Sequence, residues 1–183
     1  MKIQELQQLY AVSPQVKALA DALGKNSGKP VFLEGLVASG TAMYFAALSS
    51  ISRAGSPTAY LFVMQDVEAA GYLYHDLQQM LGDRQVLFFP SSYRRSAKYG
   101  QRDAANEILR TEVLAKLSTQ NSQLYIVTFP DAVDEQVVSR EQLNDHTLTL
   151  RQGQQVDVEQ VAVFTPPKAF RKAASAPHRL LST

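Results

Sequence analysis

The chain has 183 residues, of which 45% are hydrophobic and 19% charged, and this composition is typical of a globular protein with one sizeable core. No apolar run approaches the roughly 20 residues that a membrane span needs, and the first residues alternate polar and apolar side chains, so the sequence indicates neither a membrane span nor a secretory leader. Because the chain has no cysteine, disulfides, thiol nucleophiles and thiolate metal sites are excluded, which suits a cytoplasmic protein.

The formal net charge of +1 is unevenly distributed. Residues 91–102 hold four Lys or Arg and no acid, and so do residues 164–183. Subtracting these eight charges from the total of +1 leaves −7 on the rest of the chain. We therefore expect any anion-binding surface to be local.

In chain order, two short helices are predicted first, with Pro14 as a break between them and Gly24 as a stop signal. The apolar run Val31–Leu33 follows, which is short enough for a buried strand. A glycine-containing loop then leads into a predicted helix. The apolar residues expected on its inner face are Met43, Ala47, Leu48 and Ile51.

Short apolar runs and helices then alternate. Strands are predicted at Tyr60–Val63, Val86–Phe89 and Leu124–Val127. Asp66 is expected to cap the helix after the first of these, and Gly82 to end it. The inner face expected for that helix is Ala70, Leu73, Leu77 and Leu81. The next helix, "RDAANEILRTEVLAKLS", is expected to turn inward Ala105, Ile108, Leu109, Val113 and Leu117.

This alternation predicts an α/β domain with a mainly parallel sheet and helices on both faces, because parallel strands need crossover connections and burial on each side. A last strand is expected near Thr147–Leu150 and a domain boundary near Arg151. Residues 1–150 then form the main domain, residues 151–163 begin a second small domain, and residues 164–183 form a tail of atypical sequence without acids or an apolar period.

The loop before the third predicted helix has the spacing of a phosphate-binding loop. Such a loop has the form G-x-x-x-x-G-K-[ST], in which the lysine contacts the outer phosphates and the hydroxyl binds magnesium. Here Gly35 and Gly40 have the required spacing, but Thr41 occupies the lysine position and Ala42 the hydroxyl position. We therefore predict a degenerate phosphate loop that holds no cofactor, while weak anion binding at the helix N-terminus remains an alternative.

The other parts of a nucleotide-hydrolysing site are missing as well. An acid is expected directly after an apolar strand, yet "LYIVT" is followed by Phe129 and Pro130. The "VDEQVV" stretch at residues 133–138 resembles a DExx box, but it favours a short surface helix. The three histidines, His75, His146 and His178, show no metal-ligand spacing. The sequence thus predicts no catalytic residue and no metal site.

A basic segment, "PSSYRRSAKYGQRD" at residues 90–103, interleaves two tyrosines with four cations. This mixture is typical of surfaces that track phosphate backbones and stack on bases. A solvated connection capped by its own serines is the alternative. The candidate nucleic-acid or partner contacts are Arg94, Arg95, Lys98, Tyr99 and Arg102.

Five stretches together, "FLEGLVASGTAMYFAAL", "VLFFPSSYR", "EILRTEVLAKL", "YIVTFPDAV" and "LTLRQGQQVDVEQV", resemble the N-terminal region of bacterial transcription-repair coupling factors (Mfd), in order over residues 1–163. The resemblance implies a RecA-like domain similar to that of the excision-repair protein UvrB, with a degenerate Walker A loop. It implies a non-catalytic scaffold or interaction domain acting in nucleotide-excision DNA repair in the cytoplasm, since the ATP-dependent motor of the family lies further along its chain. The alternatives are an active P-loop nucleotide-binding enzyme and a sequence-independent nucleic-acid binder that uses the loop at residues 91–102.

Two departures limit the resemblance. The basic segment is too short for the long aromatic hairpin of UvrB, so damage recognition by a hairpin is not implied. After Val163 the sequence leaves the strand-rich pattern of the family domain that recruits UvrA, as in a truncated or frame-altered piece. The partners implied are the other domains of a full-length coupling factor, UvrA only through the missing second domain, and DNA in a weak, non-specific manner.

Overall fold

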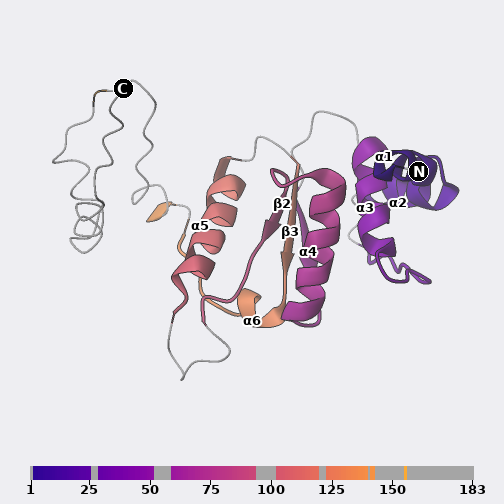
Figure 1. The fold of residues 1–183 in the computed structure, drawn as a ribbon. Coiled ribbons are helices and arrows are strands. Elements are labelled where there is room, and N and C mark those ends of the chain that lie inside the picture. The colour runs from indigo at the N-terminus through magenta and orange to yellow at the C-terminus, as the bar shows by residue number, and fades with distance from the viewer. Residues whose placement is uncertain are drawn as a thin grey trace, which may run out of the picture. The chain divides into compact units, whose positions relative to one another are not determined.

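The computed structural model describes residues 2–25, 29–51, 59–93, 102–119, 123–139, 141–142 and 155. Its contacts divide the chain into two units, Met1–Val137 and Val138–Thr183, and the helices and strands labelled in Figure 1 all belong to the first. The strand expected near Thr147–Leu150 and the boundary expected near Arg151 lie outside the described residues.

A three-stranded parallel sheet forms the centre of the first unit (Figure 1). Its strands are β1 (Ala59–Val63), β2 (Val86–Phe88) and β3 (Leu124–Thr128), in the order β1-β3-β2. Leu61 of β1 and Leu87 of β2 both lie opposite Ile126 of β3. Three of the four predicted strands are therefore confirmed, and so is their parallel arrangement.

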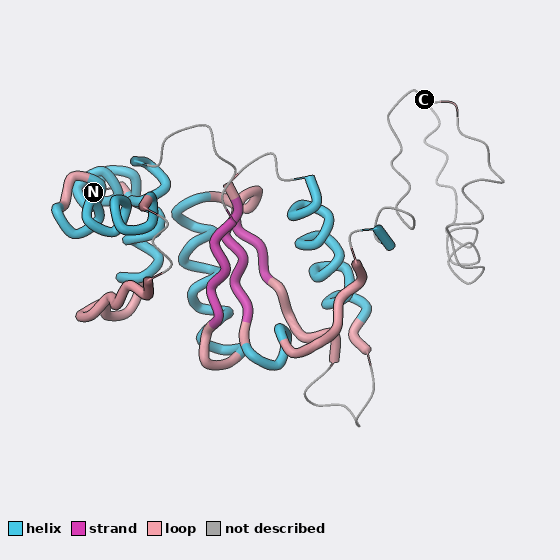
Figure 2. Tube along the Cα trace, turned by 180° about the vertical axis from the view of Figure 1, so that it is seen from behind, coloured by secondary structure: helices cyan, strands magenta, loops and turns pink. Residues whose placement is uncertain are grey.

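Helices cover the two faces of the sheet (Figures 1 and 2). The Tyr74 ring on α4 (Val67–Leu81) contacts Phe88, with 5.3 Å between ring centroids. The Arg110 guanidinium on α5 (Ala104–Thr119) lies 4.2 Å from the ring centroid of Phe89. Because successive residues of a strand point to opposite faces, α4 and α5 lie on opposite sides of the sheet, as the α/β pattern predicted.

A second core lies among the first three helices, α1 (Ile3–Ala11), α2 (Pro14–Gly24) and α3 (Gly40–Ile51). Its buried residues are Ala11, Val16, Leu19, Ala47 and Leu48. Phe45 of α3 joins this core to the sheet through edge-to-face contacts with Tyr60 and Phe62 of β1. The side-chain amide of Gln7 adds a hydrogen bond of 2.9 Å to the carbonyl oxygen of Met80 on α4.

The helix signals of the sequence are confirmed for α2 and α4. α2 begins at Pro14 and ends at Gly24, and the Asp66 carboxylate accepts a hydrogen bond of 2.8 Å from the Ala69 N–H at the start of α4. α4 ends before Gly82, which has a φ of 85°. Residues with a side chain rarely adopt this backbone conformation. Its buried residues, Ala70, Leu73 and Leu77, are three of the four expected.

The prediction of a strand at Val31–Leu33 is wrong. Residues 29–37 form no regular structure, and the exposed fractions of Val31, Phe32 and Leu33 are 47%, 85% and 42%. Pro30, directly before the run, has no N–H to donate to a neighbouring strand. Apolar character therefore did not suffice to place this run in the sheet.

The exposure of Phe32 gives a simple test of this correction. We expect Phe32→Ser to change the free energy of unfolding by no more than about 0.5 kcal/mol, the range of most surface substitutions. If this phenylalanine were buried in a strand, its loss would cost about 3–5 kcal/mol. Urea denaturation of both proteins, followed by far-ultraviolet circular dichroism, separates the two cases.

Candidate functional site

The loop before α3, at the position of the predicted phosphate loop, has two residues with positive φ and no strand before it. Gly35 has a φ of 78° and Ala38 a φ of 49°. The second value lies in the left-handed region, which costs a residue with a side chain about 1–2 kcal/mol. The loop is closed by a hydrogen bond of 2.9 Å from the N–H of Gly40 to the carbonyl oxygen of Val37.

The two positions that would carry the nucleotide chemistry have different surroundings. Thr41, at the lysine position, is half-buried and uncharged. Ala42, at the hydroxyl position, has an exposed fraction of 0% and belongs to the core between α3, α4 and the sheet. A magnesium ligand would have to reach solvent from this position, and the side chain of residue 42 points into the core instead.

The two ends of the basic segment are held together. Tyr93 and Arg102 form an isolated antiparallel bridge, and the N–H of Asp103 donates a hydrogen bond of 2.8 Å to the carbonyl oxygen of Ser92. The Arg102 guanidinium forms an exposed ion pair of 3.2 Å with Glu107. Among the candidate contacts only Arg102 lies in the described ranges, since residues 94–101 are outside them.

Ser92, which precedes this bridge, belongs to a polar cluster. The cluster consists of Ser91, Ser92, Arg110 and Glu135 and is here called the Glu135 cluster. The Glu135 carboxylate accepts a short hydrogen bond from the Ser91 hydroxyl and bonds of 2.6 Å and 3.0 Å from the hydroxyl and the N–H of Ser92. It also lies 3.5 Å from Nη1 of Arg110. The exposed fractions of the Arg110 and Glu135 side chains are 8% and 15%, so this ion pair is largely removed from water.

The Arg110 side chain connects three segments at the carboxyl ends of β2 and β3. Its Nη1 donates hydrogen bonds of 2.8 Å to the carbonyl oxygen of Pro90 and 3.0 Å to that of Ala132. The Thr128 hydroxyl donates a further hydrogen bond of 2.8 Å to the carbonyl oxygen of Phe89. The cluster therefore fixes the chain after β2 against the chain after β3.

Both charged groups of the cluster have shifted pKa values. Burial raises the pKa of Glu135, but the hydrogen bonds from Ser91 and Ser92 and the charge of Arg110 outweigh it, so the net shift is downward. Burial lowers the pKa of Arg110, and the charge of Glu135 partly offsets this shift. An arginine stays charged after such a shift, so the ion pair is present at neutral pH.

Sequence reasoning missed this cluster because the inner face of α5 begins with polar residues. Ala105 and Ile108, expected inside, are exposed, Ile108 by 68%. The inward stripe runs instead through Asn106, Arg110, Val113 and Leu117, at helical spacing. The helical spacing of these four residues was the available signal. A search for apolar residues alone cannot detect this stripe, because half of its residues are polar.

Glu135 was also assigned differently. The sequence favoured a surface helix over residues 133–138, whereas α6 spans Pro130–Val133 and ends two residues before Glu135. That interpretation is wrong for this residue, because α6 ends early and the chain then turns the Glu135 carboxylate inward. The Glu135 carboxylate is partly buried and bound by Ser91, Ser92 and Arg110.

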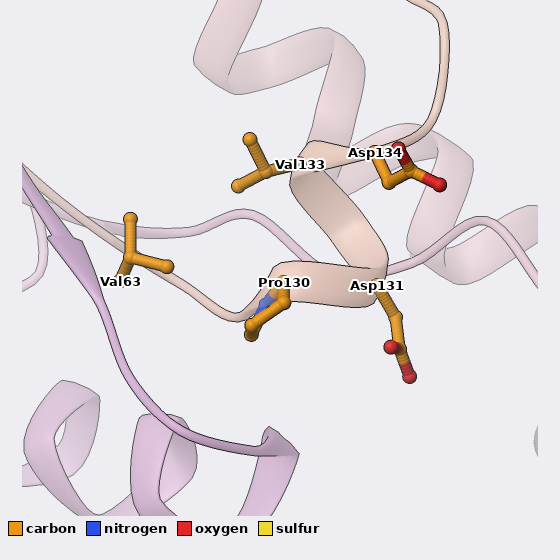
Figure 3. Close-up of a pocket in the computed structure, with 5 residues that line it drawn as sticks. All are labelled: Val63, Pro130, Asp131, Val133 and Asp134. Atoms are coloured by element: carbon orange, nitrogen blue, oxygen red, sulfur yellow. The ribbon is translucent and has the colours of Figure 1, made fainter.

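A shallow hollow of about 570 Å³ lies beside α6, at the carboxyl ends of β1 and β3 (Figure 3). It is lined by Val63, Pro130, Asp131, Val133 and Asp134. In open parallel sheets, ligands bind outside the carboxyl ends of the strands. This hollow has that position, with apolar walls and two exposed carboxylates.

The described residues contain no group of three or more His, Cys, Asp or Glu side chains that could hold a metal ion. Within the same ranges no helix is long and apolar enough to cross a bilayer. The lining of the hollow combines apolar side chains with two carboxylates.

Comparison of the chain with protein-family models, with curated proteins and with solved structures finds no match in any of the three.

Proposed function

We propose that this chain is a non-catalytic interaction domain with a degenerate RecA-like fold, of the kind found at the N-terminus of bacterial transcription-repair coupling factors. It would serve as a scaffold in nucleotide-excision DNA repair. The observation that carries this proposal is the phosphate-loop position before α3, where Thr41 replaces the lysine and the side chain of Ala42 is buried.

The surroundings of the sheet support the absence of nucleotide chemistry. Phe129, which follows β3, has an exposed fraction of only 4% and belongs to the core. The nearest following acid, Asp131, lies on α6 beside the hollow. A hydrolysing site would need a magnesium-binding acid at the strand tip and a cation on the outer phosphates. Neither group is present at the positions where the fold would place it.

The proposal predicts that the 183-residue chain neither binds nor hydrolyses ATP. With 1 mM ATP and magnesium, isothermal titration calorimetry should give no binding heat and a phosphate-release assay no turnover above buffer. A helix N-terminus without a cation supplies only part of the attraction that a triphosphate needs. Micromolar binding or measurable turnover would establish the alternative of an active nucleotide-binding enzyme and end the proposal.

The salt dependence of DNA binding distinguishes the nucleic-acid alternative from the proposed interaction domain. A chain that binds DNA mainly through the basic segment should lose affinity steeply between 50 mM and 200 mM salt, because each phosphate contact releases counterions. We expect binding to a labelled duplex to be weak at 50 mM salt and undetectable at 200 mM. Fluorescence anisotropy provides the measurement, and tight binding at 200 mM salt would favour a dedicated nucleic-acid binder.

A further inference from the structure

On the face of the sheet that carries Ile126, β3 is buried, whereas no described element covers β1. The five residues of β3 are all buried, whereas β1 alternates between half-buried and exposed residues. Tyr60 and Phe62 point toward α3, and Leu61 and Val63, on the other face, have exposed fractions of 58% and 52%. Parallel strands are normally buried on both faces, so an uncovered strand at this position is unusual.

Among the described residues, one side of the β1 backbone also lacks a pairing strand. In the described part of the chain β1 pairs only with β3. Its sequence, AYLFV, contains neither the charged residue nor the proline with which proteins protect exposed edges from pairing. An exposed edge of this kind can accept an extended segment of another chain, which adds to the sheet as a further strand.

The same surface continues into the hollow beside α6. Val63 lines the hollow together with Pro130 and Val133, and Val133 has an exposed fraction of 49% (Figure 3). Asp131 and Asp134, both exposed, complete the lining at the carboxyl end of β1. The apolar strip therefore ends at two negative charges.

From this arrangement we infer that β1 and the hollow form a docking surface for an extended segment of a partner protein, with apolar residues facing Leu61 and Val63 and a lysine or arginine facing the two aspartates. The charge decides the class of partner, because carboxylates repel a phosphate backbone and attract a basic side chain. The inference deepens the proposed interaction domain and rests on it only in assuming that the chain works by binding.

A peptide probe tests this surface directly. The probe is acetyl-Lys-Lys-Thr-Val-Thr-Val-Thr-Val-amide with a fluorescent label, because antiparallel addition to β1 places its amino end beside the aspartates. The matched probe carries Glu-Glu in place of Lys-Lys. Fluorescence anisotropy with the 183-residue chain should show saturable binding of the lysine probe and at least about fivefold weaker binding of the glutamate probe, which corresponds to about 1 kcal/mol.

Variants locate the binding on the protein. Val63→Lys should abolish binding of the lysine probe, and Asp134→Lys should weaken it at least about fivefold, since each replaces an attraction with repulsion. The control is Tyr72→Lys, which adds the same single positive charge as Val63→Lys at a position of α4 that is 68% exposed, and it should leave binding unchanged. Circular dichroism of each variant verifies that the fold is retained.

Three results would overturn the inference. They are equal binding of the two probes, binding that survives Val63→Lys, and a dimer in analytical ultracentrifugation that Val63→Lys dissolves, since the surface would then belong to a second copy. None of them depends on nucleotide, so the ATP titration can fail or succeed independently of this test.

Discussion

Glu135→Ala is expected to lower the free energy of unfolding by about 3 kcal/mol, because breaking a buried ion pair leaves an uncompensated charge in the interior. Arg110 would keep its bonds to two carbonyl oxygens but lose its only carboxylate partner among the described residues. The hydroxyl groups of Ser91 and Ser92 would lose their acceptor as well. Urea denaturation of the variant and the unmodified chain, followed by circular dichroism, gives the difference in the free energy of unfolding.

The matched control removes an exposed glutamate that also pairs with an arginine. Glu107→Ala breaks the pair with Arg102, whose side-chain exposed fractions are 68% for Arg102 and 42% for Glu107. Exposed ion pairs contribute about 0–1 kcal/mol, so this variant should lose far less stability. If Glu135→Ala and Glu107→Ala lowered the free energy of unfolding by the same amount, the ion pair of Glu135 and Arg110 would behave as an ordinary surface pair.

The cluster also predicts how stability depends on pH. The pKa of Glu135 lies below its ordinary value of 4.5 in the folded chain, so the folded state favours the charged carboxylate. Its contribution is complete above the unfolded pKa and is lost as the pH falls through the folded pKa. The stability difference between the natural chain and Glu135→Gln should therefore be constant near neutral pH and shrink as the pH falls below 4.5.

The sequence predicted the elements whose signals are local. The apolar runs at β1, β2 and β3 are each long enough to form a ladder, and Asp66 and Gly82 bound α4 through interactions with their own helix. These features depend on neighbours in sequence, and a pattern can therefore predict them.

The features that were missed depend on contacts between distant segments. Whether Val31–Leu33 joins the sheet depends on its contacts with distant segments, which the run itself does not encode. The inward turn of Glu135 depends on Ser91 and Ser92, more than 40 residues earlier in the chain. Arg110 is buried because two carbonyl oxygens and one carboxylate meet it from other segments. A buried polar group has no signature in hydropathy until its partners are known.

Restoring the hydroxyl of the degenerate phosphate loop is expected to lower the stability of the fold. We expect Ala42→Thr to destabilise the fold by about 1–3 kcal/mol, because it forces two additional heavy atoms, one of them polar, into a close-packed position. Ala42 is fully buried in the core that includes Ala70 of α4 and Val127 of β3. In a working phosphate loop the same position tolerates a hydroxyl because that hydroxyl reaches the metal ion.

Ala105→Thr is the matched control, since Ala105 is exposed on α5 and the change has only the cost of a poorer helix former, about 0.5 kcal/mol. Adding Thr41→Lys to Ala42→Thr supplies the missing cation at a half-buried position, yet the double variant should still show no phosphate release with 1 mM ATP and magnesium. Phe129 after β3 leaves no acid to hold the metal, and the new hydroxyl would point into the core. Turnover by the double variant would mean that the loop lost two side chains and kept the rest of an active site, and the scaffold proposal would then describe only the present sequence.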